Sequence, residues 1–434
     1  LVGEYLLKAF GVSLLTPHSI KLLDQSSNMQ RDVIDFLWGD CDNSELNAAF
    51  TDPTILGLCY ESLLGPVRSS STSSDAASSK NKEGIFYTPP FIVELIVEQT
   101  LKRVAPRCNT ASTKLPRVLD PACGTGFFLI RAFRHLTRNF SLQVSLEERA
   151  HTVLSHLIYG VDKDSYAIEL AKLTLLLEYT RLVPEFLNSA AEPPELLLRV
   201  GNSLIDTTML SISDIATHDR LQPLNWAKEF PDVIAAGGFD CVFGNPPYGL
   251  ARGEQIENYE NEILKKHYSD VRSGKANKYM LFMAKGYELT APHGCLSFVV
   301  PNSWLGIRSG RKLRQMFLSE RSLASVHVFD FPVFQNSIVE PVVFTVDRQM
   351  QHDTIKLVRH PGPKTDTSSS EVPVDSCLKL PEQMIPTSWS QQVARVFTAI
   401  WRDAIPLSSK QSGVISRIAC LLYTSPSPRD SFRS

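Results

Sequence analysis

The stretch VLDPACGTGFFLIRAF, from Val118 to Phe133, joins a short apolar strand, a turn of small residues and the start of a helix. The strand-like part ends at Asp120, and Gly124 and Gly126 follow in the turn. Small residues let the backbone approach a ligand, and a helix N-terminus offers free amide donors. The alternative is a tight strand-to-helix turn without a ligand. The stretch lacks the dinucleotide fingerprint Gly-x-Gly-x-x-Gly and the Walker lysine, which argues against pyrophosphate and triphosphate.

Short apolar runs recur along the chain around this stretch. They are residues 117–120, 157–161, 197–200, 239–243, 295–300, 325–330 and 341–346. Helical stretches such as LIRAFRHL separate the first several runs, which predicts an α/β fold with a mostly parallel sheet and helices on both faces. The last two runs have no helix between them, so we expect an antiparallel hairpin at the sheet edge.

Polar residues follow the runs at the ends where such a sheet binds ligands. Asp162, in GVDKD, ends the second run, where a carboxylate can accept both hydroxyls of a ribose. A solvated or helix-capping aspartate is the alternative, and Asp164 is typical of an N-cap. Asn202 follows the third run, where an amide can meet an adenine edge.

The fourth run leads into the turn Asn245-Pro246-Pro247-Tyr248. Prolines end strand pairing and fix the backbone, so this turn is rigid. A rigid turn that presents one amide and one aromatic ring can hold a flat, polar substrate. The alternative interpretation of Asn245 is an asparagine that only caps the turn.

Composition sets limits on the class of protein. The 434 residues are 43% hydrophobic and 21% charged, which is typical of a globular protein of two or three domains. A net charge of −2 means that nucleic acid must meet a local basic surface. Eight cysteines without a Cys-x-x-Cys pair predict a reduced, cytoplasmic protein without a metal site. We expect no membrane partner, because no apolar run is long enough to span a bilayer and no signal peptide opens the chain.

Together these segments resemble the Asn-Pro-Pro-Tyr family of S-adenosylmethionine-dependent DNA adenine-N6 methyltransferases, above all the large enzymes of restriction–modification and phage-defence systems. The resemblance covers roughly residues 52–347, where five motifs appear in the family's order. They are ILGLCYESLL with GIFYTPPFIVELIV, then DPACGTGFFL, GVDKD, GNPPYG, and KYMLFMAKGYEL with GCLSFVVPNSWL. The resemblance implies a Rossmann-like methyltransferase sheet with S-adenosylmethionine as cofactor.

The resemblance also implies roles for individual residues in cofactor binding. The segment at the methionine end of the cofactor corresponds to Tyr87, Thr88 and Pro89. The cofactor loop corresponds to Asp120, Ala122, Gly124 and Gly126, and the ribose carboxylate to Asp162. Asn202 stands where the family often has an aspartate touching the adenine ring.

The catalytic turn of the family corresponds to Asn245, Pro246, Pro247 and Tyr248. An adenine N6 lone pair is delocalised, so the nitrogen is a poor nucleophile. The side-chain oxygen of Asn245 and the carbonyl of Pro246 can bind both N6 hydrogens and stabilise the positive charge that grows on nitrogen. No metal is needed. Tyr248 can stack on a base flipped out of double-stranded DNA, and Phe334 is expected to be the second aromatic of that sandwich.

Basic clusters lie at Lys265–His267, Arg272–Lys278 and Arg308–Arg314. They contact DNA phosphates or form a solvated face, and both interpretations stay open. Enzymes that methylate protein glutamine or ribosomal RNA also carry this turn, and a non-catalytic DNA-binding subunit is a rival from another class. In the full-length protein we expect restriction or specificity subunits as partners.

We divide the chain by composition and motif. Residues 1–66 are expected to form a helical N-terminal region, 67–82 a serine-rich linker and 83–350 the catalytic domain. Residues 351–419 would begin a truncated target-recognition region. The run CLLYTSPSPRD, residues 420–430, resembles a translated sequencing adapter, so we expect residues 420–434 to be a non-native tail of a fragment.

Overall fold

The structure is a computed structural model. Its described residues include a nine-stranded sheet and most of the residues predicted to form the functional site. The described residues are 54, 57, 88–108, 115–139, 144–188, 192–210, 221–249, 255–271, 277–334, 339–363, 365–390 and 392–396. The chain divides into units 1–387 and 388–434, and every element below belongs to the first. Apart from residues 54 and 57, which are helical, the expected N-terminal region, and with it the linker and the tail, lies outside the described residues.

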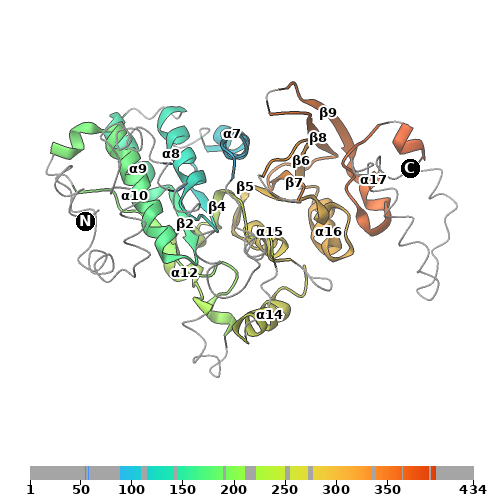
Figure 1. Ribbon diagram of the computed structural model, residues 1–434, viewed down its shortest axis with the longest axis horizontal. Coiled ribbons are helices and arrows are strands. Elements are labelled where there is room, and N and C mark those ends of the chain that lie inside the picture. The colour runs from blue at the N-terminus through green and yellow to red at the C-terminus, as the bar shows by residue number, and fades with distance from the viewer. Residues whose placement is uncertain are drawn as a thin grey trace, which may run out of the picture. The chain divides into compact units, whose positions relative to one another are not determined.

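The strands form one sheet with the order β3-β2-β1-β4-β5-β7-β6-β8-β9. Strands β1 to β5 run parallel to one another, whereas β7 is antiparallel to both β5 and β6. In Figure 1 helices α8, α9 and α10 gather beside β2, and β8 and β9 form the other end of the sheet. The strands are β1 (Val118–Asp120), β2 (Ile158–Asp162), β3 (Leu197–Val200), β4 (Phe239–Gly244), β5 (Thr290–Pro301), β6 (Leu323–Phe329), β7 (Pro341–Asp347), β8 (Thr354–His360) and β9 (Ser368–Pro373).

Helices connect most of these strands. The α-helices are α7 (Pro90–Cys108), α8 (Phe127–Asn139), α9 (Leu146–His156), α10 (Ser165–Leu182), α12 (Trp226–Glu229), α13 (Pro231–Ala235), α14 (Gln255–His267), α15 (Lys278–Leu289), α16 (Arg311–Ser319) and α17 (Val374–Lys379). The short 3-10 helices are η1 (Pro184–Asn188), η2 (Thr207–Met209), η4 (Asn302–Leu305), η5 (Arg308–Gly310) and η6 (Pro381–Gln383). None of the helices described is both long and apolar enough to cross a bilayer.

The α/β fold with a mostly parallel sheet is confirmed, and each of the seven predicted runs forms a strand. The antiparallel pairing of the last two runs is confirmed as well. Their position differs from the prediction, because β8 pairs with β6 and β9 with β8, so the β6–β7 pair lies inside the sheet. The sheet therefore continues past residue 350, where we placed the end of the catalytic domain.

The strand order brings the predicted site residues to one place. The chain passes from β1 to β2 and β3 on one side, and then returns to place β4 on the other side of β1. A ligand crevice forms at such a reversal, outside the carboxyl ends of the strands. The tips of β1 and β4 lie side by side at this reversal and would border such a crevice; they carry Asp120 and the turn that begins with Asn245.

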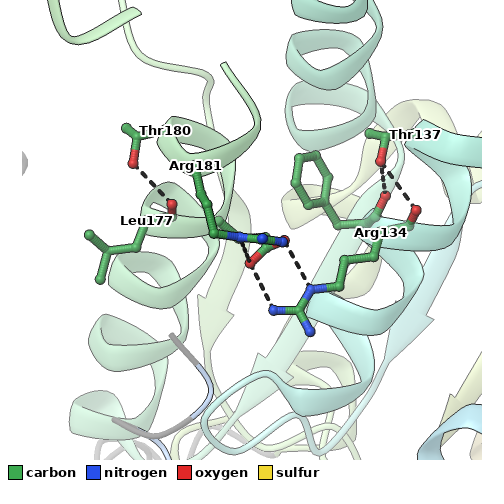
Figure 2. Close-up of polar contacts among 7 residues, drawn as sticks. Arg134, Thr137, Leu177, Thr180 and Arg181 are labelled. Carbon is green, nitrogen blue, oxygen red and sulfur yellow. Dashed lines mark hydrogen bonds and ion pairs between the residues drawn. The ribbon is translucent and has the colours of Figure 1, made fainter. Parts of the chain in front are cut away.

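A buried carboxylate joins α8 to α10 behind this crevice. Figure 2 shows Arg134 of α8 and Arg181 of α10 pointing toward each other. Both guanidinium groups donate to the carboxylate of Glu178 on α10. The Nε and Nη2 atoms of Arg134 donate to Glu178 over 2.9 and 2.8 Å. Burial would raise the pKa of Glu178, but the two guanidinium groups hold it below its usual value. The ion pair thus stays charged at neutral pH and fixes the two helices against each other.

Two histidines lie on neighbouring strands of the sheet, His327 on β6 and His360 on β8. His327 on β6 is 6% exposed, and its two ring nitrogens contact Gln99 Nε2 at 2.8 Å and His360 Nε2 at 2.9 Å. The Gln99 amide nitrogen only donates, so the facing nitrogen of His327 must accept and the ring must be neutral. Burial, together with the nearby charges, lowers the pKa of His327 to about 3.

We expect this histidine to make the fold less stable in mild acid. In the unfolded chain His327 takes up a proton near pH 6.5, whereas in the folded chain it stays neutral down to about pH 3. Its contribution to stability is therefore complete above pH 6.5 and is lost as the pH falls; the loss amounts to about 2 kcal/mol at pH 5. Urea unfolding at pH 7.5 and pH 5 measures the loss, and His327→Gln should reduce it by that amount. Equal losses in the two proteins would contradict this assignment.

Candidate active site

The turn after β1 is shaped by two glycines. Gly124 has a φ of 51° and Gly126 a φ of 89°, in the region that L side chains rarely adopt. A Cβ on Gly126 would also stand 3.1 Å from the Cβ of Ala171 on α10. The N–H of Cys123 donates to the Val161 carbonyl over 3.0 Å, which ties the turn to β2. The backbone thus lies closely against its neighbours, as both interpretations of this turn require.

Asp120 is a buried acid at the tip of β1. Its side chain is 1% exposed, and Oδ1 accepts the N–H of Ala122 over 3.0 Å. The other oxygen, Oδ2, receives no hydrogen bond from the described part of the chain. Burial raises the pKa of Asp120 well above its usual range, and the charge of Asp162 raises it further. Such a carboxyl is poised to interact with a cation or a hydrogen-bond donor.

Asp162 joins the tip of β2 to the glycine turn. Its Oδ2 accepts the N–H of Gly124 over 2.8 Å, and its Oδ1 accepts the N–H of Asp164 over 2.9 Å. Burial raises the pKa of Asp162, although these backbone donors oppose the shift. Each carboxylate oxygen has a second lone pair, so the group can still accept a ligand hydroxyl. Asp164 caps α10 by accepting from Tyr166 and Ala167, which confirms its N-cap interpretation.

Asn202 lies at the tip of β3, and its amide is held within the protein. The side chain is 2% exposed; Nδ2 donates to Glu260 over 3.2 Å, and Oδ1 accepts the N–H of Leu204 over 3.1 Å. Its contact with a ligand adenine stays a prediction. The sequence alone did not single out Glu260, because it is one of several charged residues on an amphipathic helix.

The turn after β4 starts at a glycine that lies against Asp120. Gly244 has a φ of 154°, and a Cβ there would stand 2.5 Å from Oδ1 of Asp120. Only a residue without a side chain lets β4 end this close to the carboxylate of β1. The next residue, Asn245, is therefore brought to the edge of the same crevice.

The orientation of Asn245 is set by Thr88. The Asn245 Nδ2 group donates to the hydroxyl oxygen Oγ1 of Thr88 over 3.0 Å. Because the amide is planar, its oxygen Oδ1 faces away from Thr88. Thr88 was expected at the methionine end of a cofactor, and the structure shows that its hydroxyl contacts the Asn245 amide. Of its neighbours, Tyr87 lies outside the described residues, and the Pro89 carbonyl accepts the N–H of Ile92 over 2.9 Å.

Tyr248 is buried at the end of this turn. Its hydroxyl donates to the Val299 carbonyl over 3.3 Å, and the side chain is 6% exposed. The ring lies edge to face with Phe334, with the centroids 6.2 Å apart and the planes at 74°. The structure thus brings the two predicted aromatics together. Their role around a base stays a prediction.

Two family models match this chain, and both are described as methylases. Residues 52–183 match the family described as N-6 DNA Methylase, and residues 156–334 match the family described as Eco57I restriction-modification methylase. The two overlapping matches include the glycine turn, Asp162, Asn202 and the Asn-Pro-Pro-Tyr turn.

Individual relatives are much longer than this chain. The type II restriction enzyme and methyltransferase RM.Eco57I of Escherichia coli is 25% identical over 61% of the chain and 28% of that protein. The adenine-specific methyltransferase PglX of Streptomyces coelicolor is 26% identical over 54% of the chain and 20% of that protein. The chain spans about a quarter of the length of these relatives.

Solved structures show the same fold. The cryo-EM structure of a DrdV–DNA complex has a TM-score of 0.50 and 15% identity, covering 83% of this chain and 36% of that one. At this identity the likeness bears on the fold alone. Residues 52–183 and 156–334 are thus each similar to a methylase family, the first described as N-6 DNA Methylase and the second as Eco57I restriction-modification methylase.

Proposed function

We propose that this chain is the methyltransferase part of a restriction–modification or phage-defence enzyme that methylates the N6 amine of adenine in DNA. One observation carries the proposal. The amide of Asn245 is held by Thr88 so that its oxygen faces away, in a rigid turn at the edge of the same crevice as Asp120. A fixed amide oxygen beside a proline carbonyl is suited to a substrate that carries two hydrogens on one nitrogen.

The residues around the crevice fit S-adenosylmethionine. Buried Asp120 has an oxygen without a partner among the described residues, and a carboxylate there favours a cationic ligand. At Gly126 and Gly244 a Cβ would crowd Ala171 and Asp120, so glycine at these positions lets the two turns lie close against their neighbours. Asp162 would accept the ribose hydroxyls, and Asp120 with its turn would face the positively charged end. When bound, this cofactor supplies an electrophilic methyl group.

The catalytic turn acts on the attacking nitrogen. The oxygen of Asn245 and the carbonyl of Pro246 would accept the two N6 hydrogens of adenine. These acceptors stabilise the positive charge that develops on nitrogen during attack, and they favour its pyramidal form. Because Thr88 and the two prolines hold the acceptors, little reorganisation is needed at the moment of reaction.

The target adenine must leave the duplex to reach this turn. Tyr248 would provide one stacking face, and Phe334 the other. The two rings contact each other edge to face in this structure, so they would have to separate to admit a base. The hydroxyl of Tyr248 is anchored on β5, so the larger movement is expected at Phe334, which follows β6.

Double-stranded DNA is the proposed substrate, and a basic surface formed by two joined segments supports it. The C-terminal turn of α14 exposes Lys265, Lys266 and His267, and the segment after β5 exposes Arg308, Arg311 and Lys312. The ammonium of Lys312 donates to the Ser269 carbonyl over 2.7 Å, which joins the two groups.

The third predicted basic cluster, Arg308–Arg314, contributes fewer exposed charges to this surface than expected. Arg314 is completely buried and donates to the backbone carbonyls of Ile307 and Glu382 over 2.9 and 2.7 Å. Both interpretations of Arg314 were wrong, because it neither reaches phosphates nor lies on a solvated face. Of the cluster at Arg272–Lys278, residues 272–276 lie outside the described part, and Lys278 pairs with Glu260.

Restriction or specificity subunits stay proposed partners of the full-length protein.

Removing the side-chain acceptor should slow the chemistry without weakening cofactor binding. Asn245→Ala should lower the single-turnover rate of methylation of adenine-containing duplex DNA by about 10²–10³, the usual effect of losing one preorganised hydrogen bond. Calorimetry should show almost unchanged affinity for S-adenosylmethionine, because other strand tips form that pocket. Asn261→Ala, on α14, is the matched control and should keep the wild-type rate. A near-normal rate for Asn245→Ala would refute the adenine-amine mechanism.

The basic surface predicts a salt effect on DNA affinity. Lys266→Gln and Lys312→Gln should each weaken binding of a fluorescent duplex and reduce the slope of log affinity against log salt by about 0.9 per lost phosphate contact. Fluorescence anisotropy at several NaCl concentrations measures both quantities. Lys102→Gln removes an exposed lysine of α7 as a control and should leave the slope unchanged. Wild-type slopes in both test variants would show that DNA binds elsewhere.

A further inference from the structure

Glu260 is a buried acid that none of the predicted roles uses. It lies on α14 and is 5% exposed. Its carboxylate accepts from Asn202 Nδ2 over 3.2 Å and from Lys278 Nζ over 3.2 and 3.3 Å. The ammonium of Lys163 lies 3.8 Å from its Oε1. One carboxylate therefore contacts residues from the tip of β3, the start of α15 and the position directly after Asp162.

The charge of Glu260 is maintained despite its burial. Burial would raise the pKa of Glu260, but the charges of Lys278 and Lys163 outweigh it and hold the pKa below its usual value. A buried ion pair is a weak contributor to stability, since apolar side chains of similar size often serve as well. Its clearer effect is to fix the direction of the polar groups that it contacts.

The groups that Glu260 fixes lie beside the proposed adenosine pocket. Strands β2 and β3 are neighbours, with Asp162 opposite Val200, so Lys163 and Asn202 follow adjoining strand tips. By accepting from Nδ2, Glu260 leaves the Asn202 oxygen to accept from Leu204 and close the turn after β3. The next residue, Ser203, donates to the Pro121 carbonyl over 2.6 Å, which ties this turn to the glycine turn.

We propose that Glu260 is a positioning residue for the cofactor: it holds Asn202 and Lys163 in place at the two strand tips that would receive the adenosine half of S-adenosylmethionine. This inference rests on the proposed function, and it adds a residue from the helix that follows the catalytic turn. Glu260 itself is held beneath its partners and does not have to touch the ligand. Its loss should therefore affect cofactor affinity and leave the transfer step largely unchanged.

The test compares Glu260→Gln with the wild-type chain. The substitution keeps the shape of the side chain and removes its charge, so Lys163 and Lys278 lose their common partner. Calorimetry should show that affinity for S-adenosylhomocysteine falls by about tenfold or more, as expected for charge-assisted hydrogen bonds. The rate of methyl transfer at saturating cofactor should stay within about threefold of the wild-type rate, since the transition-state acceptors are intact. Glu262→Gln, an exposed acid on the same helix, should change neither quantity.

If Glu260 had only a structural role, its substitution would change the measured affinity and rate in a different way. Unchanged affinity in Glu260→Gln would overturn the inference, and so would a rate at saturating cofactor that falls as much as the affinity does. Glu260→Asp keeps the charge and should recover part of the affinity. A wild-type chain that binds S-adenosylhomocysteine but methylates no DNA would contradict the proposed function alone, because the calorimetric comparison would still decide the role of Glu260. A wild-type chain that binds no cofactor would overturn both.

Discussion

The close approach of Gly244 to Asp120 is the constraint on which the site depends. A Cβ at position 244 would stand 2.5 Å from the Asp120 carboxylate, so the tips of β4 and β1 can meet only through a glycine. This contact sets the distance between the two halves of the proposed reaction. In that proposed reaction Asp120 and its turn would belong to the cofactor side, whereas Asn245 would begin the substrate side. Methyl transfer needs both reactants in near-attack geometry, and in the proposed reaction the fixed distance between the two strand tips would help to impose it.

The contacts around the crevice form a continuous set. Thr88 sets the Asn245 amide, Gly124 and Asp162 bind each other, and Ser203 bonds to Pro121. Each of these three contacts joins one strand tip or loop to another. The cost of this arrangement is two buried acids with raised pKa values at one end of the sheet. A cationic ligand would relieve that cost, which is a physical reason for the site to favour one.

Much of this could be predicted from the sequence, for identifiable reasons. The buried strands are short apolar runs, and the site residues follow them directly, so strand position alone located Asp120, Asp162 and Asn245. Strand β9, SSSEVP, was not predicted because it is an exposed edge strand without an apolar pattern. Arg314 was misread as part of a basic surface, although it shares a helix face with buried Phe317 and Leu318, and that spacing was a usable signal. Glu260 had no comparable signal, because its partners come from segments distant in the sequence.

The most direct measurement of the central claim concerns Thr88, because the claim is that a fixed Asn245 oxygen activates the adenine amine. Thr88→Val removes the acceptor of the Asn245 amide and keeps the shape of the side chain. Single-turnover methylation of duplex DNA should slow by about tenfold, while the affinity for S-adenosylmethionine changes little and Thr88→Ser retains the rate. A Thr88→Val protein with the wild-type rate would contradict the claim. A variant that lost cofactor affinity and kept its rate at saturation would return Thr88 to a role in cofactor binding alone.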